Sequence, residues 1–269
     1  LPCGGRGVLP EPSKPAAVVA SWHTLAALPV QVFEPVPATA QELERVHARA
    51  YVEGLLLRGR ANGYGAMSPE EAAALPWVVG SFVSAARHAV RTGKPCASPT
   101  SNFGLAGHDR GSAFSALNGL LVAALALQAE GLADRVAIFD GDQHFAAGTA
   151  DILARLRPPG ITHLSFGARR PRRDATEAWL DALPGVLDGL LRGADVLLYQ
   201  AAVDPHVDDP LGGTLTTAQL ARRDRLVFEQ ARATGVPVAW NLGGGYQSPI
   251  RRVLDLHDQT ALTCQAVFG

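Results

Sequence analysis

The sequence predicts an α/β fold in which helices cover both faces of a mostly parallel sheet. Its 269 residues alternate short apolar runs with helical stretches of ten or more residues. The short run at 136–139 is apolar throughout and 195–204 is mostly apolar, as expected of strands that are buried on both faces. No low-complexity linker or internal repeat divides the sequence, so we expect a loose Gly/Pro-rich segment at 1–15 and a single domain at 16–269.

Local signals predict the individual elements. Thr39 and Glu42 form a capping box, and Ser68 starts another helix because Pro69 suits the first helical position. Strands are predicted at residues 17–22, 30–34, 95–99, 136–139, 161–166, 195–204 and 236–240. Helices are predicted at residues 39–47, 50–58, 78–91, 115–132, 175–191, 216–234 and 249–267, with the further helix start at 68–71.

Composition excludes several classes of protein. A hydrophobic content of 47% with 18% charged residues is globular, and a net charge of −1 gives no electrostatic basis for binding nucleic acid or an anionic membrane. Three widely spaced cysteines (Cys3, Cys96 and Cys264) indicate reduced thiols and a reducing compartment. No apolar run approaches the length of a membrane span, and the N-terminal residues lack the order of a signal peptide. We therefore expect a soluble, cytoplasmic protein.

Polar side chains follow the apolar run at 136–139. Asp142 and His144 are two residues apart, so on an extended backbone they point to the same side and can reach one point in space. A carboxylate and an imidazole are two of the three protein ligands of a catalytic zinc site, which leaves a fourth position for water. By itself, the same pattern is equally typical of a polar loop with a capping aspartate.

Two further strand ends carry suitable side chains. Ligands of an open parallel sheet bind outside the carboxyl ends of its strands. Asp204 ends a predicted strand, and Tyr246 follows three glycines that allow close backbone approach and leave the phenol free to donate a hydrogen bond. Two aspartates and one histidine predict a mononuclear site, because a second ion would need more bridging carboxylates and the sequence offers Ala146 and His206. Such a ligand set accepts Zn²⁺, Fe²⁺ or Co²⁺.

Several separate motifs, in the right order, resemble the zinc-dependent histone deacetylase family, and more closely its bacterial branch. They are SPTSNFGLA (98–106), SAFSALNGL (112–120), FDGDQH (139–144), VDPHVDDPLGG (203–213), NLGGGY (241–246) and VLDLHDQT (253–260). The resemblance covers roughly residues 15–265. It implies the arginase/deacetylase fold, a three-layer α/β/α sandwich around a mostly parallel sheet of about eight strands.

The resemblance also implies roles for individual residues. Asp142, His144 and Asp204 would be the zinc ligands, and Tyr246 would hydrogen-bond the substrate carbonyl and the oxyanion formed from it. The family's buried potassium ion would be framed by Asp140 and by backbone carbonyls near Asp142, His144 and Ser165. The substrate pocket would include Phe103, Gly244 and Gly245, with Tyr64 at its entrance.

One part of the family pattern is missing. Where the family has two consecutive histidines, this sequence has Gly104 and Leu105. Those histidines activate the attacking water and protonate the leaving amine, and each is oriented by an aspartate. Asp140 retains one of these partner positions, whereas Ala147 occupies the other. His108 lies in the same loop and is a candidate substitute. Acid–base groups typically contribute on the order of 100- to 10,000-fold, so we expect a formed zinc pocket with weak or absent amide hydrolysis.

Three functional hypotheses follow. The first is a pseudoenzyme that binds an acylated amine, of the acyl-lysine or acetylpolyamine type, or a partner chain. The apolar replacements would make its pocket floor roomier and suit a longer acyl group. The second is a slow but genuine zinc-dependent deacylase or esterase that uses the metal, Tyr246 and His108. The third is a metal-free structural or oligomerisation module.

Overall fold

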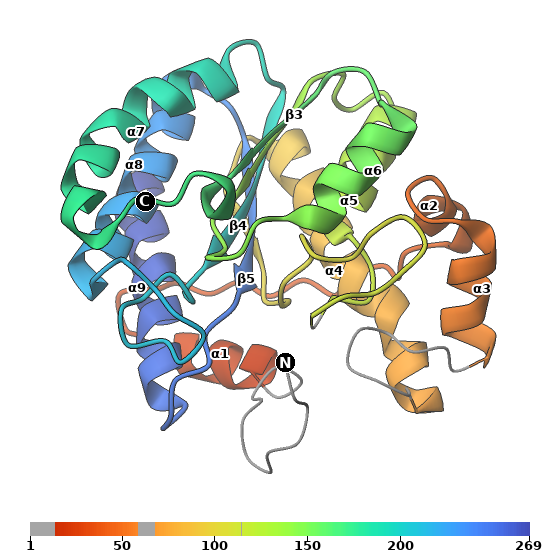
Figure 1. Ribbon diagram of the computed structural model, residues 1–269, viewed down its shortest axis with the longest axis horizontal. Helices are drawn as coiled ribbons and strands as arrows, with labels where there is room; N and C mark the ends of the chain where they lie inside the picture. The colour runs from red at the N-terminus through yellow and green to blue at the C-terminus, as the bar shows by residue number, and fades with distance from the viewer. Residues whose placement is uncertain (1–13, 59–67, 114) are drawn as a thin grey trace.

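The computed structural model of the chain describes residues 14–58, 68–113 and 115–269. Within these ranges, five strands form one sheet in the order β1-β5-β4-β2-β3, and every pairing is parallel (Figure 1). The strands are β1 (Cys96–Ser98), β2 (Val136–Asp140), β3 (Ile161–Ser165), β4 (Val196–Ala202) and β5 (Val238–Gly243). The α/β class and the parallel sheet are therefore confirmed.

Helices cover both faces of the sheet. They are α1 (Lys14–Trp22), α2 (Ala40–Glu44), α3 (Arg49–Arg58), α4 (Pro69–Thr92), α5 (Gly119–Ala129), α6 (Ala147–Leu156), α7 (Thr176–Leu191), α8 (Thr217–Thr234) and α9 (Arg251–Phe268), with short 3₁₀ turns at Phe166–Ala168 and Arg173–Ala175. In Figure 1, α4, α5 and α6 lie on one side of the sheet and α7, α8 and α9 lie on the other. Each face has its own hydrophobic core, so the three-layer arrangement is also confirmed.

The expected sheet of about eight strands is wrong for the described residues, and the N-terminal part of the chain shows why. Residues 17–22, predicted as a strand, belong to α1, whose Val18 and Trp22 are buried one helical turn apart and pack in the core with α9. Residues 30–34, also predicted as a strand, pair with no strand that the structure describes. Close by, the backbone nitrogen of Val36 donates to Ser84 Oγ of α4, so this stretch runs along a helix.

The predicted helix starts are confirmed in detail. Thr39 and Glu42 form the capping box of α2, and Ser68 with Glu71 forms that of α4. The polar hydroxyl accepts a backbone N–H that has no partner within the helix, which fixes where each helix begins. The helix α6, which begins three residues after His144, was not predicted.

The strands end together at one edge of the sheet. Asp140 at the end of β2 is in register with Ser165 of β3 and with Gln200 of β4. Gln200 is in turn in register with Asn241 of β5. Because all strands are parallel, the loops that follow them meet at this edge.

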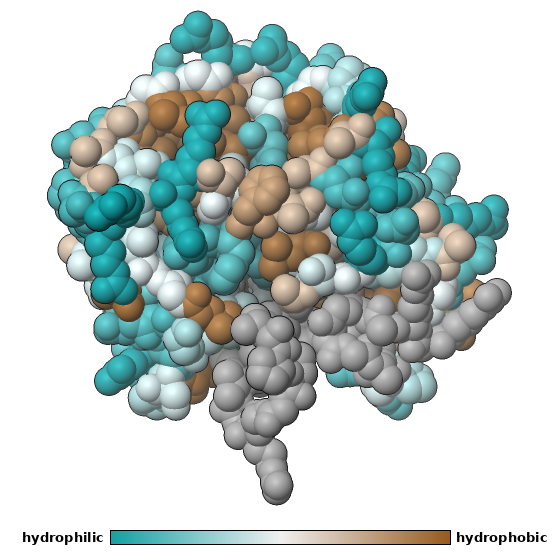
Figure 2. Space-filling model, viewed as in Figure 1, coloured by the Kyte–Doolittle hydropathy of each residue, from teal (hydrophilic) through white to brown (hydrophobic). Residues whose placement is uncertain are grey.

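Polar and apolar residues share the surface on the face shown in Figure 2. Hydrophobic residues interrupt the hydrophilic ones in the upper part of this face and near its centre. The large exposed apolar side chains include Phe145 and Leu211, which lie in the loops that follow β2 and β4. Among the described helices, none has the length and apolar character that a bilayer crossing requires.

Candidate metal centre

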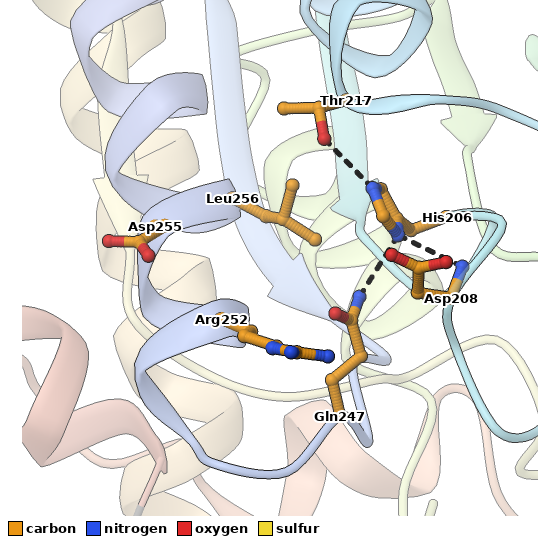
Figure 3. Close-up of a pocket in the computed structure, with 7 residues that line it drawn as sticks. All are labelled: His206, Asp208, Thr217, Gln247, Arg252, Asp255 and Leu256. Carbon is orange, nitrogen blue, oxygen red and sulfur yellow. Dashed lines mark hydrogen bonds between the residues drawn. The ribbon is translucent and has the colours of Figure 1, made fainter.

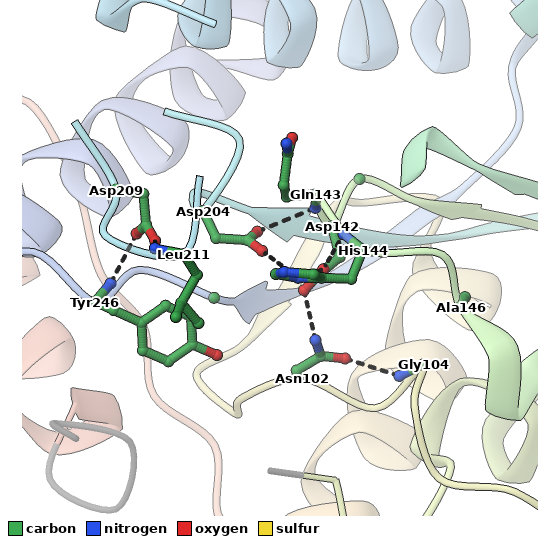
Figure 4. A network of polar contacts seen from close by, with 12 residues as sticks. Asn102, Gly104, Asp142, Gln143, His144, Ala146, Asp204, Asp209, Leu211 and Tyr246 are labelled. Carbon is green, nitrogen blue, oxygen red and sulfur yellow. Dashed lines mark hydrogen bonds and ion pairs between the residues drawn. The ribbon is translucent and has the colours of Figure 1, made fainter. Parts of the chain in front are cut away.

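The loops after β2 and β4 bring together the three predicted metal ligands. Asp142, His144 and Asp204 each offer one ligand atom, and these atoms all lie within 4.8 Å of one another. His144 Nδ1 is 3.0 Å from Asp142 Oδ1 and 3.2 Å from Asp204 Oδ2 (Figure 4). The convergence predicted from the spacing of Asp142 and His144 is therefore present.

The electrostatics of this cluster fit a cation. Asp142 and Asp204 are 2% and 0% exposed, so two carboxylates are withdrawn from water side by side. The hydrogen bonds of His144 to Asp142 and Asp204 raise the pKa of its imidazole to about 10. Burial and the charge of Asp204 raise the pKa of Asp142. Two carboxylates and one imidazole nitrogen therefore face one point, which is a donor set suited to a single divalent metal ion.

Backbone hydrogen bonds fix the loop that carries two of the ligands. The backbone nitrogen of Asp142 donates to Asp140 Oδ1 at 3.0 Å, and that of His144 donates to Asp142 Oδ1 at 2.7 Å. The backbone nitrogen of Gln143 reaches Asp204 Oδ1 at 3.3 Å and so links this loop to the one after β4. The carboxylates therefore have defined orientations even without a metal ion.

The glycine-rich turn after β5 approaches the cluster closely. A Cβ at Gly244 (φ +54°) would lie 2.4 to 2.5 Å from atoms of Asp204, so only glycine fits there. The backbone nitrogen of Tyr246 donates to Asp209 Oδ2 at 2.9 Å, and Asp209 Oδ1 accepts from the backbone nitrogen of Leu211. In Figure 4 the ring of Tyr246 lies beside Leu211 with its hydroxyl on the side of the cluster.

The histone deacetylase domain model matches residues 10–170, which is more than half of the chain. The chain belongs to the histone deacetylase family. An uncharacterised protein of Picosynechococcus sp. strain PCC 7002 is 31% identical over 259 residues, which cover 85% of this chain and 83% of that protein.

Two solved structures share the fold. The acetylpolyamine aminohydrolase from Burkholderia pseudomallei has a TM-score of 0.74 at 19% identity, over 100% of this chain and 94% of that one. The HD domain of HDA15 has a TM-score of 0.79 at 20% identity, over 99% of this chain and 83% of that one.

At the two positions where the deacetylase resemblance implies a histidine pair, the structure has other residues and a different packing. A Cβ at Gly104 would lie 2.1 Å from Asp140 Oδ2 and 3.2 Å from Ala146 Cβ. The space next to Gly104 is therefore filled by Asp140, and the expected roomier pocket floor is not found at this position. Leu105 is half-buried, and Ala147 is exposed at the start of α6. None of these three side chains can transfer a proton.

Other predicted site residues, His108 and Phe103, make contacts that the sequence did not predict. His108 Nδ1 lies 2.8 Å from the carbonyl oxygen of Val46, and the structure does not bring it into the ligand cluster. The predicted pocket residue Phe103 instead packs its ring in the core, 5.6 Å from the ring of Phe82. Tyr64 lies outside the described residues.

The predicted potassium site has mixed support. Asp140 and Ser165 are register partners at the strand ends, as a shared ion would require. Asp140 Oδ1 already accepts from Gln200 Nε2 and from the backbone of Asp142, and Oδ2 is directed at Gly104. The potassium ion stays a prediction.

Several residues around the cluster were missed by the sequence reasoning. Gln200 is a fully buried polar side chain in the apolar strand β4, which is itself a signal, because a buried amide needs partners. Asn102 contacts Asp142 directly and carried no comparable signal. Arg223 is a fully buried guanidinium that pairs with Asp224 and donates to the carbonyl of Gly141 at 3.2 Å.

A separate cavity of about 320 Å³ lies beside His206 (Figure 3). Both ring nitrogens of His206 have protein partners, with Nε2 2.9 Å from Thr217 Oγ1 and Nδ1 accepting from the backbone of Asp208 at 3.1 Å. His206 therefore has a structural role in the loop after β4 and does not join the metal ligands.

Proposed function

We propose that this protein binds an acylated amine, of the acyl-lysine or acetylpolyamine type, beside a zinc ion held by Asp142, His144 and Asp204, and that its amide hydrolysis is weak or lost. The proposal rests on the contrast between the three metal ligands and the two positions that lack a proton-transfer group. The three ligand atoms lie within 4.8 Å of one another, whereas Gly104 and Leu105 offer no group for proton transfer.

The residues around the ligands have separate tasks in this proposal. A bound zinc ion supplies Lewis-acid activation of a carbonyl and of water. Tyr246 donates its phenolic hydrogen to the substrate carbonyl oxygen, and Asp209 holds the backbone of Tyr246 in place for that contact. Among the described residues, no group at positions 104 and 105 delivers a proton to a leaving amine, which costs on the order of 100- to 10,000-fold.

The substrate type is supported by the family and by one related structure. The Burkholderia protein is by name an acetylpolyamine aminohydrolase, so the substrate that its name gives is a small acylated amine. Zinc is proposed because the family resemblance implies it, and Fe²⁺ or Co²⁺ suits the same ligands.

A slow hydrolase is the second candidate, and the position of Tyr246 favours it. The turn that carries Tyr246 packs directly on Asp204 through Gly244, so an oxyanion-stabilising group is available next to the ligands. Esters need less leaving-group protonation than amides. Ester turnover that exceeds amide turnover would support this candidate, whereas zinc-free purified protein would support a structural module.

The deciding experiment compares zinc-loaded protein with its Asp204→Ala variant on trifluoroacetyl-lysine, an activated substrate. We expect stoichiometric zinc in the parent only, equal background turnover in both, and saturable binding of acetyl-lysine or acetylated polyamine by the parent. Parent turnover that disappears in the variant would show a working hydrolase. Absence of zinc from both proteins would contradict the proposed metal pocket.

A further inference from the structure

Asn102 lies between the predicted ligand Asp142 and the loop that contains Gly104. It is 5% exposed, and its amide nitrogen donates to Asp142 Oδ2 at 2.5 Å. Its amide oxygen accepts from the backbone nitrogen of Gly104 at 2.9 Å and from Gln200 Nε2 at 3.1 Å. Both the nitrogen and the oxygen of the Asn102 amide therefore have buried partners.

These contacts fix which way the amide points. Nitrogen and oxygen of an asparagine amide are interchangeable by shape alone, and the assignment depends on their partners. The backbone nitrogen of Gly104 is an obligate donor, so the atom that faces it must be the oxygen. The –NH₂ group of Asn102 must then face the carboxylate of Asp142.

A hydrogen bond from Gln200 anchors Asn102 on its other side. Gln200, on the central strand β4, donates to Asn102 and to Asp140 Oδ1 at 2.7 Å, and it accepts from the backbone nitrogen of Phe103 at 2.8 Å. Asn102 is thus anchored from the sheet as well as from its own loop. A donor held this firmly restricts rotation of the Asp142 carboxylate.

We infer that Asn102 is a positioning residue for the metal, which holds Asp142 so that Oδ1 faces the metal position and Oδ2 is kept out of it. Asp142 Oδ1 is the oxygen that lies 3.0 Å from His144 Nδ1. With Oδ2 engaged by Asn102, Asp142 binds through one oxygen and the geometry of the ligand set is fixed before the ion arrives. This inference rests on the proposed metal-binding function.

The test measures metal binding by the full chain without using activity. Zn²⁺ affinity is obtained by competition with a chromophoric chelator, and Co²⁺ absorption reports the coordination geometry. Loss of a hydrogen-bond partner of a metal ligand typically costs 10- to 100-fold in affinity, so we expect this loss and a changed Co²⁺ spectrum in Asn102→Ala. Gln128→Ala is the matched control, because Gln128 also donates its amide to two acceptors, the carbonyls of Asp134 and Pro159. We expect parent-like affinity and spectrum in that control.

A second variant separates positioning from loop closure. Asn102→Asp keeps the oxygen that Gly104 and Gln200 need and replaces only the donor that faces Asp142. It should give a changed Co²⁺ spectrum. Without metal it should melt below the parent at pH values where both carboxylates are ionised, because two buried carboxylates then face each other. Parent-like metal affinity and spectra in both Asn102 variants would overturn the inference. A parent that binds neither Zn²⁺ nor Co²⁺ would instead contradict the proposed function.

Discussion

The carboxylate of Asp140 lies where the first side-chain carbon of a larger residue at position 104 would be. Asp140 Oδ2 is buried without a hydrogen-bond partner among the described residues, and it is 2.1 Å from the Cβ position of Gly104. No carbon atom can approach an oxygen to which it is not bonded that closely. A residue with a side chain, such as an engineered histidine, can therefore replace Gly104 only if Asp140 moves.

This relationship predicts coupling between substitutions at the two positions. Gly104→Ala should destabilise the protein by about 1–3 kcal/mol through overpacking. In an Asp140→Ala background the same substitution should cost less, by at least about 0.5 kcal/mol, because the clashing carboxylate is absent. Urea unfolding of the four proteins measures this difference.

Gly185→Ala is the control for the Gly104 series. A Cβ at Gly185, within helix α7, meets nothing within 4 Å. That substitution should stabilise the protein by about 0.5–1 kcal/mol, since glycine is unfavourable in a helix. Additive effects at positions 104 and 140 would show that the two residues do not compete for one space.

The close approach of Gly244 to Asp204 predicts a specific loss of metal binding. Gly244→Ala would push a carbon atom into Asp204, so we expect Zn²⁺ affinity to fall by at least about tenfold. Gly235→Ala tests the cost of backbone conformation alone, because Gly235 also has a positive φ (+69°) but an open Cβ position. It should cost about 1–2 kcal/mol of stability and leave zinc affinity unchanged. Equal zinc affinities in the two variants would contradict the proposed contact.

The stabilising effect of zinc should increase with pH. His144 and Asp142 have pKa values raised above those of the unfolded chain, so the metal-free protein loses stability as pH rises through the folded values. For His144 this window runs from 6.5 to about 10. Zinc replaces the proton, so its apparent affinity should rise about tenfold per pH unit in this window. Thermal melts with and without Zn²⁺ at about pH 6 and pH 8.5 check the prediction, and an equal shift at both would contradict it.

Acid should destabilise the protein through His47. This buried ring contacts the carbonyl of Gly107 through Nδ1 and accepts the backbone N–H of Asn118 at Nε2, each at 2.9 Å. Burial lowers the pKa of His47 to about 4. As the pH falls below 6.5, His47 of the unfolded chain therefore takes up a proton while His47 of the folded protein stays neutral. The protein should therefore lose up to about 3 kcal/mol of stability as the pH falls from 6.5 to about 4.

The measurement for His47 is urea unfolding at about pH 7 and pH 4.5. His47→Gln should be less stable at the higher pH and show a weaker dependence on pH. His23→Gln, at an exposed position, serves as the control and should behave like the parent. An unchanged pH dependence in His47→Gln would show that other groups set the acid limit.

Much of the fold and of the ligand set follows from local sequence. The apolar strand at 136–140, the capping boxes at Thr39 and Ser68 and the two-residue spacing of Asp142 and His144 each depend on a few neighbouring residues, and the structure contains all of them. Where a short apolar run fits either a helix or a strand, as at 17–22, local sequence does not decide. There, packing of Val18 and Trp22 against α9 selects the helix.

The environment of the ligands was decided only by tertiary structure. Asn102 reaches Asp142 across 40 residues of sequence, and Asp140 fills the space at Gly104 from the end of β2. Phe103 and His108 belong to the same loop as Gly104, yet one side chain packs in the core and the other binds a distant carbonyl. By itself the sequence determined the α/β class and the three residues able to hold a metal, because strand ends and side-chain spacing are local properties. The contacts that orient those residues join segments far apart in the chain, and they exist only once the sheet has brought its strand ends together.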